Sequence, residues 1–457
     1  MPDKSPAAHR IDPKPTEGLS YDPNQPKFWE RPALERELTR VFDICHGCRM
    51  CFGFCPTFPL LFSFVDARDG NVLALTPEEI DRTCETCYQC KLCYVKCPYT
   101  PDDGHEWQLD FPRLMLRKKA QDAKRDGVGR RERVLGNPDR LGRLAKLNPT
   151  LANWGNRNRL QRFVMEKTLG IHRDKLLPDF HGETFEDWFR NHRRELGVDR
   201  GEHGKVALFH TCFVNFNRPE LGQATVDVLR KNGVEVKSPK QNCCGMPALD
   251  GGDIDFARQE AKSNVEALLP LVRQGYRILA INPTCSLTMR KEVPTLLGTA
   301  EAKEVAAAVM DVNEYLFKLK RAGKLNRSFQ STPVSVAYHV PCHLRAQNIG
   351  YRSRDLMRAI PGTEVEQVER CCGHDGTWAM KTEFFELSLK AGKKAFDELE
   401  EKHAQELATD CPLAAVQFQQ ALGRTALHPT QILSRAYRAP EEGGFSTPVP
   451  KEPEGSG

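Results

Sequence analysis

Two stretches of the sequence share one pattern of cysteine and proline. Residues 45–56 read CHGCRMCFGFCP, and residues 87–98 read CYQCKLCYVKCP. In each, three cysteines recur at every third position, a fourth follows four residues later, and a proline comes directly after it. Three thiolates at this spacing can wrap a loop around three corners of a [4Fe–4S] cubane, while the fourth completes a second cluster nearby. The two stretches therefore predict a pair of [4Fe–4S] clusters in a helical ferredoxin module.

The fourth cysteine of each stretch is expected to bind the cluster of the other stretch. The predicted ligands of the first cluster are Cys45, Cys48, Cys51 and Cys97, and those of the second are Cys87, Cys90, Cys93 and Cys55. Zinc is the alternative, but it is usually bound by two separated cysteine pairs. Cys84 precedes Cys87 at the right spacing, yet a register that starts there lacks the Cys-Pro ending, so we expect Cys84 to be a spectator. His46 and His105 are expected to pack or to tune the clusters.

The chain has 457 residues and 17 cysteines. Its length allows two to four domains. The N-terminal stretch MPDKSPAAHRIDPKPTEG contains no apolar run typical of a secretory signal, and no stretch reaches the roughly 18–20 apolar residues of a membrane span. We therefore expect a cytoplasmic protein, or one bound peripherally to the inner face of a membrane. In a reducing compartment, an odd and clustered set of cysteines indicates metal binding rather than disulfides.

The eight cysteines beyond position 200 reveal an internal duplication. Three cysteines of the first copy recur in the second at offsets of 130, 128 and 126 residues, in the pairs Cys212 and Cys342, Cys243 and Cys371, and Cys285 and Cys411. The tripeptide Cys-Cys-Gly occurs in both copies, at 243–245 and 371–373. A steady offset with matched motifs indicates two homologous domains.

Each copy has the alternating pattern of an α/β domain. The strands predicted from short apolar runs are 206–209, 234–236 and 278–281 in the first copy and 334–338 and 365–368 in the second. The helices predicted between them are 219–231, 253–273, 384–400 and one after Tyr351. Each cysteine follows the carboxyl end of a strand, the edge where ligands bind in parallel sheets. The two sites expected there are made of Cys212, Cys243, Cys244 and Cys285, and of Cys342, Cys371, Cys372 and Cys411.

The predicted fold is multidomain, α plus α/β, with an N-terminal all-helical two-cluster ferredoxin module followed by two homologous α/β Cys-Cys-Gly domains. The expected units are a disordered segment (1–33), the ferredoxin module (34–125), a basic helical linker (126–200), the first Cys-Cys-Gly domain (201–325), the second (326–439) and a disordered tail (440–457). Both ends are rich in proline and charge and poor in aliphatic residues, which disfavours a packed core.

This arrangement resembles that of a family of iron–sulfur subunits with tandem Cys-Cys-Gly domains. The family includes iron–sulfur subunits of anaerobic glycerol-3-phosphate dehydrogenase, glycolate oxidase and heterodisulfide reductase. The resemblance covers about residues 34–438, and the segments that carry it are CYQCKLCYVKCPYTP, HEWQLDFPRLMLR, YHVPCHLRAQNIG and CCGHDGTW. In the family, the full Cys-Cys-Gly motif ends in Cys-x2-Cys and can hold a non-cubane cluster that cleaves disulfides.

The two copies depart from that motif. They end in Cys285-Ser-Leu-Thr288 and Cys411-Pro-Leu-Ala414, so each offers four cysteines instead of five. Four thiolates suffice for one ordinary cluster or for one zinc ion, and buried free thiols remain a third possibility. We expect one or two further iron–sulfur clusters, with zinc as the alternative. Five histidines fall near these sites, His210, His339, His343, His374 and His428, and we expect His343 and His374 to tune the bound group by donating N–H.

The sequence offers no recognisable flavin, nicotinamide or phosphate-loop motif. We therefore expect an electron carrier that serves a separate flavoprotein dehydrogenase or other redox protein, with quinone or another acceptor at the far end. The alternatives are reduction of a disulfide at a Cys-Cys-Gly cluster and a cluster-based redox sensor or scaffold. Residues 113–175 hold 18 lysines and arginines against 6 acidic residues, which indicates a solvated linker or a docking face for an acidic partner or anionic membrane. We expect no nucleic acid partner.

Replacing Cys97 tests the exchange of ligands. Cys97→Ala should damage the cluster built mainly from Cys45, Cys48 and Cys51, although Cys97 belongs to the other stretch, because a cubane needs four ligands. Electron paramagnetic resonance of the reduced variant, with Cys84→Ala as the control, measures the loss. Damage confined to the cluster of Cys87, Cys90 and Cys93 would contradict the exchange.

Overall fold

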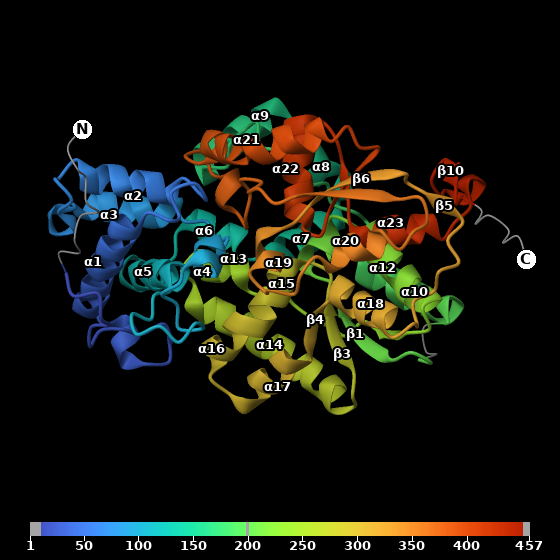
Figure 1. Cartoon of the computed structure of the whole chain (residues 1–457), viewed down its shortest axis with the longest axis horizontal. Helices are drawn as coiled ribbons and strands as arrows, with labels where there is room; N and C mark the ends of the chain where they lie inside the picture. Colours follow the sequence, from blue (N-terminus) through green and yellow to red (C-terminus); the bar gives the residue numbers. More distant parts are fainter. Residues whose placement is uncertain (1–10, 198–200, 451–457) are drawn as a thin grey trace, which may run out of the picture.

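The computed structural model describes residues 11–197 and 201–450. Its N-terminal part is a helical module at one end of the molecule, drawn in blue in Figure 1. The helices of this module are α1 (Arg31–Cys48), α2 (Thr57–Asp66), α3 (Pro77–Thr86), α4 (Leu92–Lys96) and α5 (Phe111–Asp126). Their core is formed by apolar side chains such as Leu38, Phe58 and Leu114, which are almost fully buried. None of the helices in the described part of the chain is long and apolar enough to cross a membrane.

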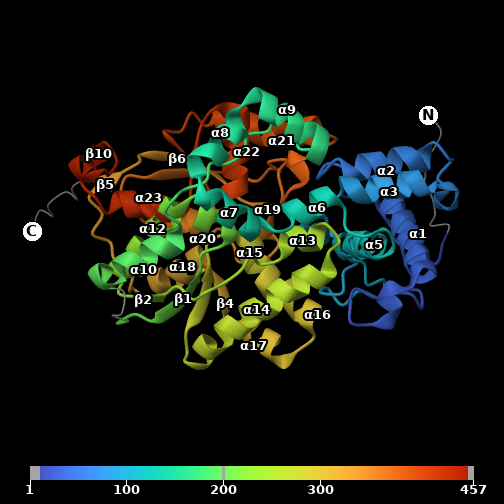
Figure 2. The ribbon, with the colours of Figure 1, turned by 180° about the vertical axis from the view of Figure 1, so that it is seen from behind.

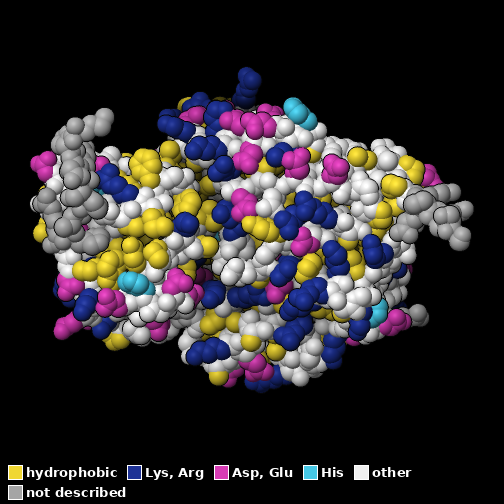
Figure 3. Space-filling model, viewed as in Figure 1, with side chains coloured by type: hydrophobic (Ala, Val, Ile, Leu, Met, Phe, Trp, Pro, Cys, Tyr) yellow, Lys and Arg dark blue, Asp and Glu magenta, His cyan; other side chains and the backbone are white. Residues whose placement is uncertain are grey.

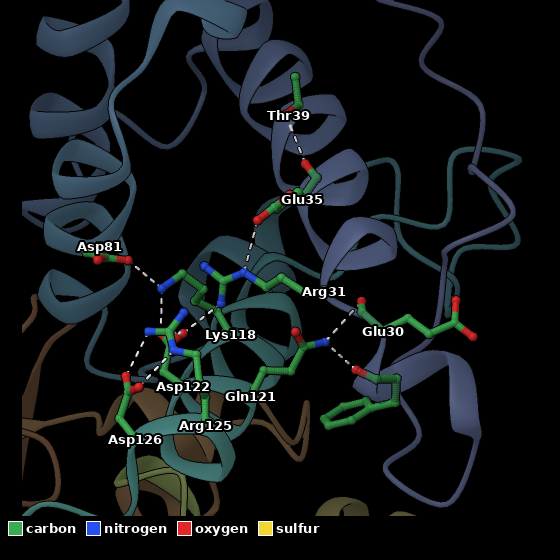
Figure 4. Close-up of polar contacts among 11 residues, drawn as sticks. Glu30, Arg31, Glu35, Thr39, Asp81, Lys118, Gln121, Asp122, Arg125 and Asp126 are labelled. Atoms are coloured by element: carbon green, nitrogen blue, oxygen red, sulfur yellow. Dashed lines mark hydrogen bonds and ion pairs between the residues drawn. The ribbon is translucent and has the colours of Figure 1, made fainter.

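The segment that precedes α1 is ordered against the module. The buried Arg117 guanidinium of α5 donates to the carbonyl oxygens of Phe28 and Gly18, at 2.9 and 2.8 Å. Gln121 of the same helix donates to the carbonyls of Phe28 and Glu30, as Figure 4 shows. Our prediction of disorder was therefore wrong for residues 11–33, because polar side chains of α5 satisfy part of this backbone and Phe28 is buried in a hydrophobic core. Residues 1–10 lie outside the described residues.

Five helices lead from this module across the α/β domains. They are α6 (Arg130–Leu135), α7 (Pro138–Leu147), α8 (Pro149–Arg157), α9 (Arg159–Leu169) and α10 (Phe185–Leu196). Asn137 and Asn148 cap α7 and α8, each with proline at the first helical position. The region contacts both α/β domains, because Gly142 lies against Phe216, and Arg131 pairs with Glu383 at 2.7 Å. We call residues 126–197 the strap; its helices run over the rear face in Figure 2.

The first α/β domain is a parallel four-stranded sheet in the order β2-β1-β3-β4. Its strands are β1 (Lys205–Phe209), β2 (Glu235–Lys237), β3 (Arg277–Ala280) and β4 (Val309–Asp311). Its helices are α11 (Cys212–Phe216), α12 (Pro219–Lys231), α13 (Met246–Asp250), α14 (Ile254–Arg273), α15 (Pro283–Leu287), the π-helical turn η3 (Thr288–Glu292), α16 (Val293–Leu297), α17 (Ala300–Ala308) and α18 (Val312–Arg321).

The second domain repeats this topology with the strand order β7-β6-β8-β9, again parallel. Its strands are β6 (Ser335–His339), β7 (Glu364–Val368), β8 (Glu406–Thr409) and β9 (Ala426–Leu427). Its helices are α19 (Cys342–Arg345), α20 (Arg352–Met357), α21 (Phe385–Glu401), α22 (Pro412–Leu422) and α23 (Pro429–Ala436). The predicted fold class, a helical module followed by two homologous α/β domains, is confirmed.

The two α/β domains share one hydrophobic core. Residues of the first sheet, such as Leu208 and Val236, belong to the same buried cluster as Tyr338 and Val365 of the second. Helices α12 and α23 pack together, and the hydroxyls of Thr225 and Thr430 meet at 3.0 Å between them. Burial of this common core joins the domains into one rigid pair.

The segment after the second domain is also ordered. The turn η5 (Pro440–Glu442) leads to β10 (Thr447–Pro448), which pairs antiparallel with β5 (Ser331–Thr332). Phe445 is buried beneath this pair. Our prediction of a disordered tail was therefore wrong for residues 440–450, because one aromatic anchor and a short strand pairing fix them. Residues 451–457 lie outside the described residues.

A buried ion cluster joins the helical module to the first α/β domain. The Glu292 carboxylate of η3 accepts from the Lys91 ammonium at 2.5 Å and lies 3.5 Å from the Arg113 guanidinium. Burial alone would raise the pKa of Glu292, but the charges of Lys91 and Arg113 lower it to about 2. The pair crosses 201 residues of sequence, so the cluster forms only in the folded chain.

Glu292→Gln should lower the free energy of unfolding by roughly 3–5 kcal/mol, because it leaves the buried Lys91 without its counter-ion and removes one of the two carboxylates near Arg113. Since folding lowers the pKa of Glu292, its contribution is present above about pH 4.3, the ordinary value for Glu, and is lost as the pH falls toward 2. Anaerobic denaturation by guanidinium measures both effects. The control is Glu304→Gln, which removes an exposed pair with Arg273 and should cost less than about 1 kcal/mol. Equal losses in the two variants would contradict the prediction.

Candidate metal centres

The four cysteines predicted for the first cluster line one cavity of the helical module. These residues are Cys45, Cys48, Cys51 and Cys97. The wall is completed by apolar side chains that include Phe58, Phe62 and Leu109. Helix α1 ends at Arg49 in the left-handed conformation, with φ 53°, which turns the chain toward Cys51. Cys97 reaches this cavity from the second stretch, at the end of α4.

The four cysteines predicted for the second cluster line a neighbouring cavity. These residues are Cys55, Cys87, Cys90 and Cys93. Gln89 and Lys91 both have positive φ, 57° and 60°, which bends the loop so that its cysteines face one centre. The side-chain amide of Gln89 donates through Nε2 to Cys87 Sγ at 3.4 Å. Cys84 lies outside both cavities, buried on α3 beside Lys118.

The chemistry of these two groups fits a bound metal. Burial raises the pKa of Cys45 well above its usual value, and the nearby Cys51 and Cys97 raise it further. Burial and neighbouring thiols act in the same direction on the pKa values of Cys90 and Cys93. Thiolates packed this closely repel one another unless cations lie between them, so metal binding is the condition under which the groups are stable as thiolates. Four-thiolate sets of this spacing suit iron–sulfur clusters.

The first Cys-Cys-Gly site lies at the carboxyl edge of the first sheet. Cys212 Sγ and Cys243 Sγ are 3.8 Å apart. Cys244 accepts hydrogen bonds from the thiols of Cys243 and Cys285, which lower its pKa well below the usual value. Thr288, at the position of the missing fifth cysteine, also hydrogen-bonds to Cys244. The strap contributes a positioning contact, because Asp139 Oδ2 accepts from the Cys243 amide at 2.6 Å.

The second Cys-Cys-Gly site gathers Cys342, Cys371, Cys372 and Cys411 at the carboxyl edge of the second sheet. Cys371 Sγ accepts from the Gly373 amide at 3.2 Å and lies 3.0 Å from the hydroxyl of Tyr88, a residue of the helical module. Gly373 has φ 71°, and a Cβ atom there would lie 1.9 Å from the Ser388 carbonyl oxygen. Only glycine therefore fits this turn of the motif.

The four groups of thiols follow one another through the molecule. Cys51 of the first ferredoxin group interacts electrostatically with Cys93 of the second. Cys90 of the second interacts with Cys371 of the second Cys-Cys-Gly site. Cys411 of that site interacts with Cys285 of the first Cys-Cys-Gly site. The second Cys-Cys-Gly site therefore neighbours both the ferredoxin module and the first Cys-Cys-Gly site.

His343 lies where three of these groups meet. Its Nε2 donates to the Gln89 carbonyl oxygen at 2.8 Å, and its Nδ1 lies 2.8 Å from the Thr284 hydroxyl. Gln89 stands between Cys87 and Cys90, Thr284 precedes Cys285, and His343 follows Cys342. One buried ring thus fixes the relative positions of three cysteine groups.

The other histidines have mostly structural partners. His210, His339 and His428 are buried and hydrogen-bonded to neighbouring hydroxyls, amides or carbonyls. His46 lies 2.9 Å from Asp66, and His105 accepts from the Trp107 amide. His374 differs, because neither ring nitrogen has a hydrogen-bond partner in the described chain although the side chain is buried. A buried imidazole without partners indicates a polar group bound beside it.

One further charged residue, Lys175, was not expected from the sequence. It comes from the strap, is buried, and donates to the Gln417 amide oxygen at 2.5 Å. Burial lowers the pKa of Lys175 to about 8, while the nearby Cys372 opposes that shift. A buried ammonium beside the second Cys-Cys-Gly site favours an anionic group there. As one of the 18 basic residues of 113–175, Lys175 has no pattern that would have singled it out.

Comparisons with known proteins agree with this architecture. Residues 38–125 match the model of the citrate utilization protein B Fer4-like domain, and residues 206–290 and 336–419 match that of the cysteine-rich domain. The chain is 29% identical over 306 residues to one subunit of the anaerobic glycerol-3-phosphate dehydrogenase of Escherichia coli (strain K12), which covers 66% of this chain and 76% of that protein. The chain is a homologue of iron–sulfur subunits of oxidoreductases.

Two further relatives of this iron–sulfur protein extend the comparison. One subunit of the fumarate reductase (CoM/CoB) of Methanothermobacter marburgensis is 28% identical over 245 residues, which is 52% of this chain and 46% of the relative. Lactate utilization protein A of Halalkalibacterium halodurans is 29% identical over 187 residues, which is 39% of this chain and 73% of the relative. The resemblance seen in the sequence is confirmed, and iron–sulfur binding is supported for both kinds of domain.

Proposed function

We propose that this protein relays electrons between a separate flavoprotein dehydrogenase and quinone or another acceptor. The observation that carries the proposal is the contiguous line of four thiol groups, which connects one end of the molecule to its interior. The homologues are subunits of dehydrogenases and reductases, which supports a role as one component of a larger complex.

The proposed cofactors are two [4Fe–4S] clusters in the helical module and one or two further iron–sulfur clusters, or zinc, in the Cys-Cys-Gly domains. The ligands proposed for the module are Cys45, Cys48, Cys51 and Cys97 for one cluster and Cys87, Cys90, Cys93 and Cys55 for the other. The ligands proposed for the Cys-Cys-Gly domains are Cys212, Cys243, Cys244 and Cys285, and Cys342, Cys371, Cys372 and Cys411. The linings of the two cavities in the module support the exchange of Cys55 and Cys97.

Such clusters supply one-electron chemistry when bound, and this chain supplies their spacing and surroundings. Hydrogen bonds to ligand sulfurs favour the reduced state by compensating negative charge. Tyr88, Gln89 and the Gly373 amide are in place to make such bonds to Cys371 and Cys87. Buried cysteines such as Cys90, Cys244 and Cys372 are shielded from water, which limits side reactions.

Electron relay is favoured over disulfide reduction because of what replaces the fifth cysteine. Thr288 fills that position in the first domain and Ala414 in the second, and neither side chain can supply a thiolate. The family resemblance implies that cleavage of a substrate disulfide requires a cluster bound by all five cysteines of the full motif. The alternative therefore lacks the ligand on which it depends.

The ferredoxin end of the line is proposed as the contact with a redox partner. Cys45, Cys48, Cys51 and Cys97 are only partly buried, whereas Cys87, Cys90 and Cys93 are buried. Around the first group, Met50, Phe52 and Val95 are about half exposed. Hydrophobic side chains gather over this module on the face shown in Figure 3. An apolar patch beside a partly exposed redox site suits a transient protein contact.

The strap is proposed as a contact with an anionic membrane. Large apolar side chains stand exposed along α7, α8 and α9: Leu144, Leu147, Leu151, Trp154, Leu160, Phe163 and Val164. Exposed cations are interleaved with them, among them Arg140, Arg143, Arg159 and Lys167. Apolar and basic residues alternating on short surface helices are typical of segments that lie in the membrane interface.

Metal analysis of anaerobically purified protein tests the relay. Four clusters would give about 16 iron atoms per chain, three would give about 12, and the ferredoxin pair alone about 8. Protein reduced with dithionite should then pass electrons to a soluble quinone analogue. The loss of the paramagnetic resonance signals of the reduced clusters measures this transfer. Near-zero iron with stoichiometric zinc would end the proposal. Reduction of a disulfide by the reduced protein alone would favour the alternative.

A vesicle assay tests the membrane contact. The double variant Leu147→Glu and Trp154→Glu should bind phosphatidylglycerol vesicles about a hundredfold more weakly, because burial of two such side chains contributes roughly 3 kcal/mol or more. Co-sedimentation measures binding, and the matched control is Leu73→Glu, an equally exposed leucine on the helical module. Binding unchanged in the double variant, or lost equally in the control, would refute the contact.

A further inference from the structure

The two Cys-Cys-Gly sites differ in one acidic residue. The motif of the second domain continues as Gly373-His374-Asp375, whereas that of the first continues as Gly245-Met246-Pro247. Asp375 is buried, and its carboxylate interacts electrostatically with all four thiols of the second site. Pro247 offers no donor at the matching position.

The Asp375 carboxylate contacts an imidazole, a thiol and a backbone amide rather than a lysine or arginine. Its Oδ2 lies 3.7 Å from Cys342 Sγ and 3.2 Å from His343 Nε2. No lysine or arginine within residues 11–197 and 201–450 forms an ion pair with it. Buried carboxylates are normally paired with a cation or bound to a metal.

His343 is not a ligand in this arrangement. Its Nε2–H donates to the Gln89 carbonyl, and its Nδ1 is occupied by the Thr284 hydroxyl. The ring can instead share its Nε2–H with Asp375 and so orient the carboxylate, as imidazoles commonly do for metal-binding acids. Cys342, whose thiol donates to Asp375, and Asp375 itself are left as the candidate ligands on that side of the site.

The separation of these two donors suits one shared metal atom. Ligands bound at about 2.0–2.3 Å with tetrahedral angles lie roughly 3.5 Å apart, close to the 3.7 Å between Cys342 Sγ and Asp375 Oδ2. Cys342, His343 and Asp375 also have their donor atoms within 4.8 Å of one another. The buried ring of the adjacent His374, near which Lys175 lies, has no hydrogen-bond partner in the described chain.

We propose that the Asp375 carboxylate is a ligand in the second Cys-Cys-Gly site and binds the same metal atom as Cys342. The carboxylate gives this domain a fifth donor atom, an oxygen. The fifth cysteine sulfur of the full motif is missing, because Ala414 occupies its position. The first domain keeps four sulfur donors, with Thr288 bonded to Cys244. The metal atom is an iron of a cluster or a zinc ion, both of which accept thiolate and carboxylate ligands. The proposal relies on the proposed function only for the presence of a metal at the second site.

The test compares full-length wild type, Asp375→Asn and Asp375→Cys after anaerobic purification. Iron, zinc and acid-labile sulfide are counted per chain, and paramagnetic resonance spectra are recorded. Asp375→Asn should change the paramagnetic resonance spectrum of the second site, or, for zinc, remove one oxygen ligand in X-ray absorption, because the four remaining thiolates can still hold the metal. Asp375→Cys should keep the metal with an altered spectrum, or, for zinc, with one more sulfur ligand in X-ray absorption. The control is Asp250→Asn, a neighbouring buried acid whose charge is already met by Lys119 at 2.6 Å; it should keep the metal.

Metal content and spectrum unchanged in Asp375→Asn would overturn the proposal. If Asp375→Asn does not fold, Asp375→Cys decides, and a spectrum identical to that of wild type would overturn it as well. A wild-type second site that holds no metal would also overturn the proposal. The same is true if the wild-type site holds zinc that is bound by sulfur ligands alone. Zinc that loses an oxygen ligand in Asp375→Asn would support Asp375 as a ligand while removing this site from the electron relay. Iron with an unchanged spectrum in Asp375→Asn would do the reverse.

Discussion

A buried thiolate is stable only beside positive charge, and sixteen cysteines of this chain are packed into four groups. Burial raises the pKa of most of these thiols, and their neighbours raise it further. Cations supplied by the protein lie close to several of them, including Lys119 near Cys87 and Lys175 near Cys372. These side chains offset part of the charge of a bound group, and the metal itself provides the rest. The loops and glycines bring the cysteines together, and the buried lysines supply part of the positive charge that these thiolates need.

The shared core of the two α/β domains brings the thiol groups together. Each parallel sheet presents its cysteines at the carboxyl edge, and the common core holds the two edges close enough for Cys285 and Cys411 to interact. The helical module is tied to the same region by the Lys91–Glu292 pair and by His343. The strap crosses the pair of domains and contributes Asp139 to one site and Lys175 to the other.

Duplication has produced two sites with one topology and different chemistry. The strand orders are the same and the Cys-Cys-Gly turns correspond, yet the second site has a carboxylate, an unpartnered imidazole and a buried ammonium nearby. The second site also contacts the ferredoxin module through Tyr88. A difference in ligands and hydrogen-bond donors between two cluster sites is one way to give the clusters different reduction potentials.

Spacing and repetition in the sequence determined the cysteine groups, the helical module and the duplicated α/β domains. The sequence determines these features because strands, helices and Cys-x2-Cys loops are specified by residues close together in the chain. Only the tertiary structure decided which sites are neighbours, the positions of Lys175 and Asp375, and the ordering of residues 11–33 and 440–450. The short edge strands β4 and β9 likewise escaped prediction. Each of these features rests on contacts between residues far apart in the chain, such as Arg117 with Gly18 or Lys175 with Gln417, and no local pattern encodes which distant partner a polar side chain will meet.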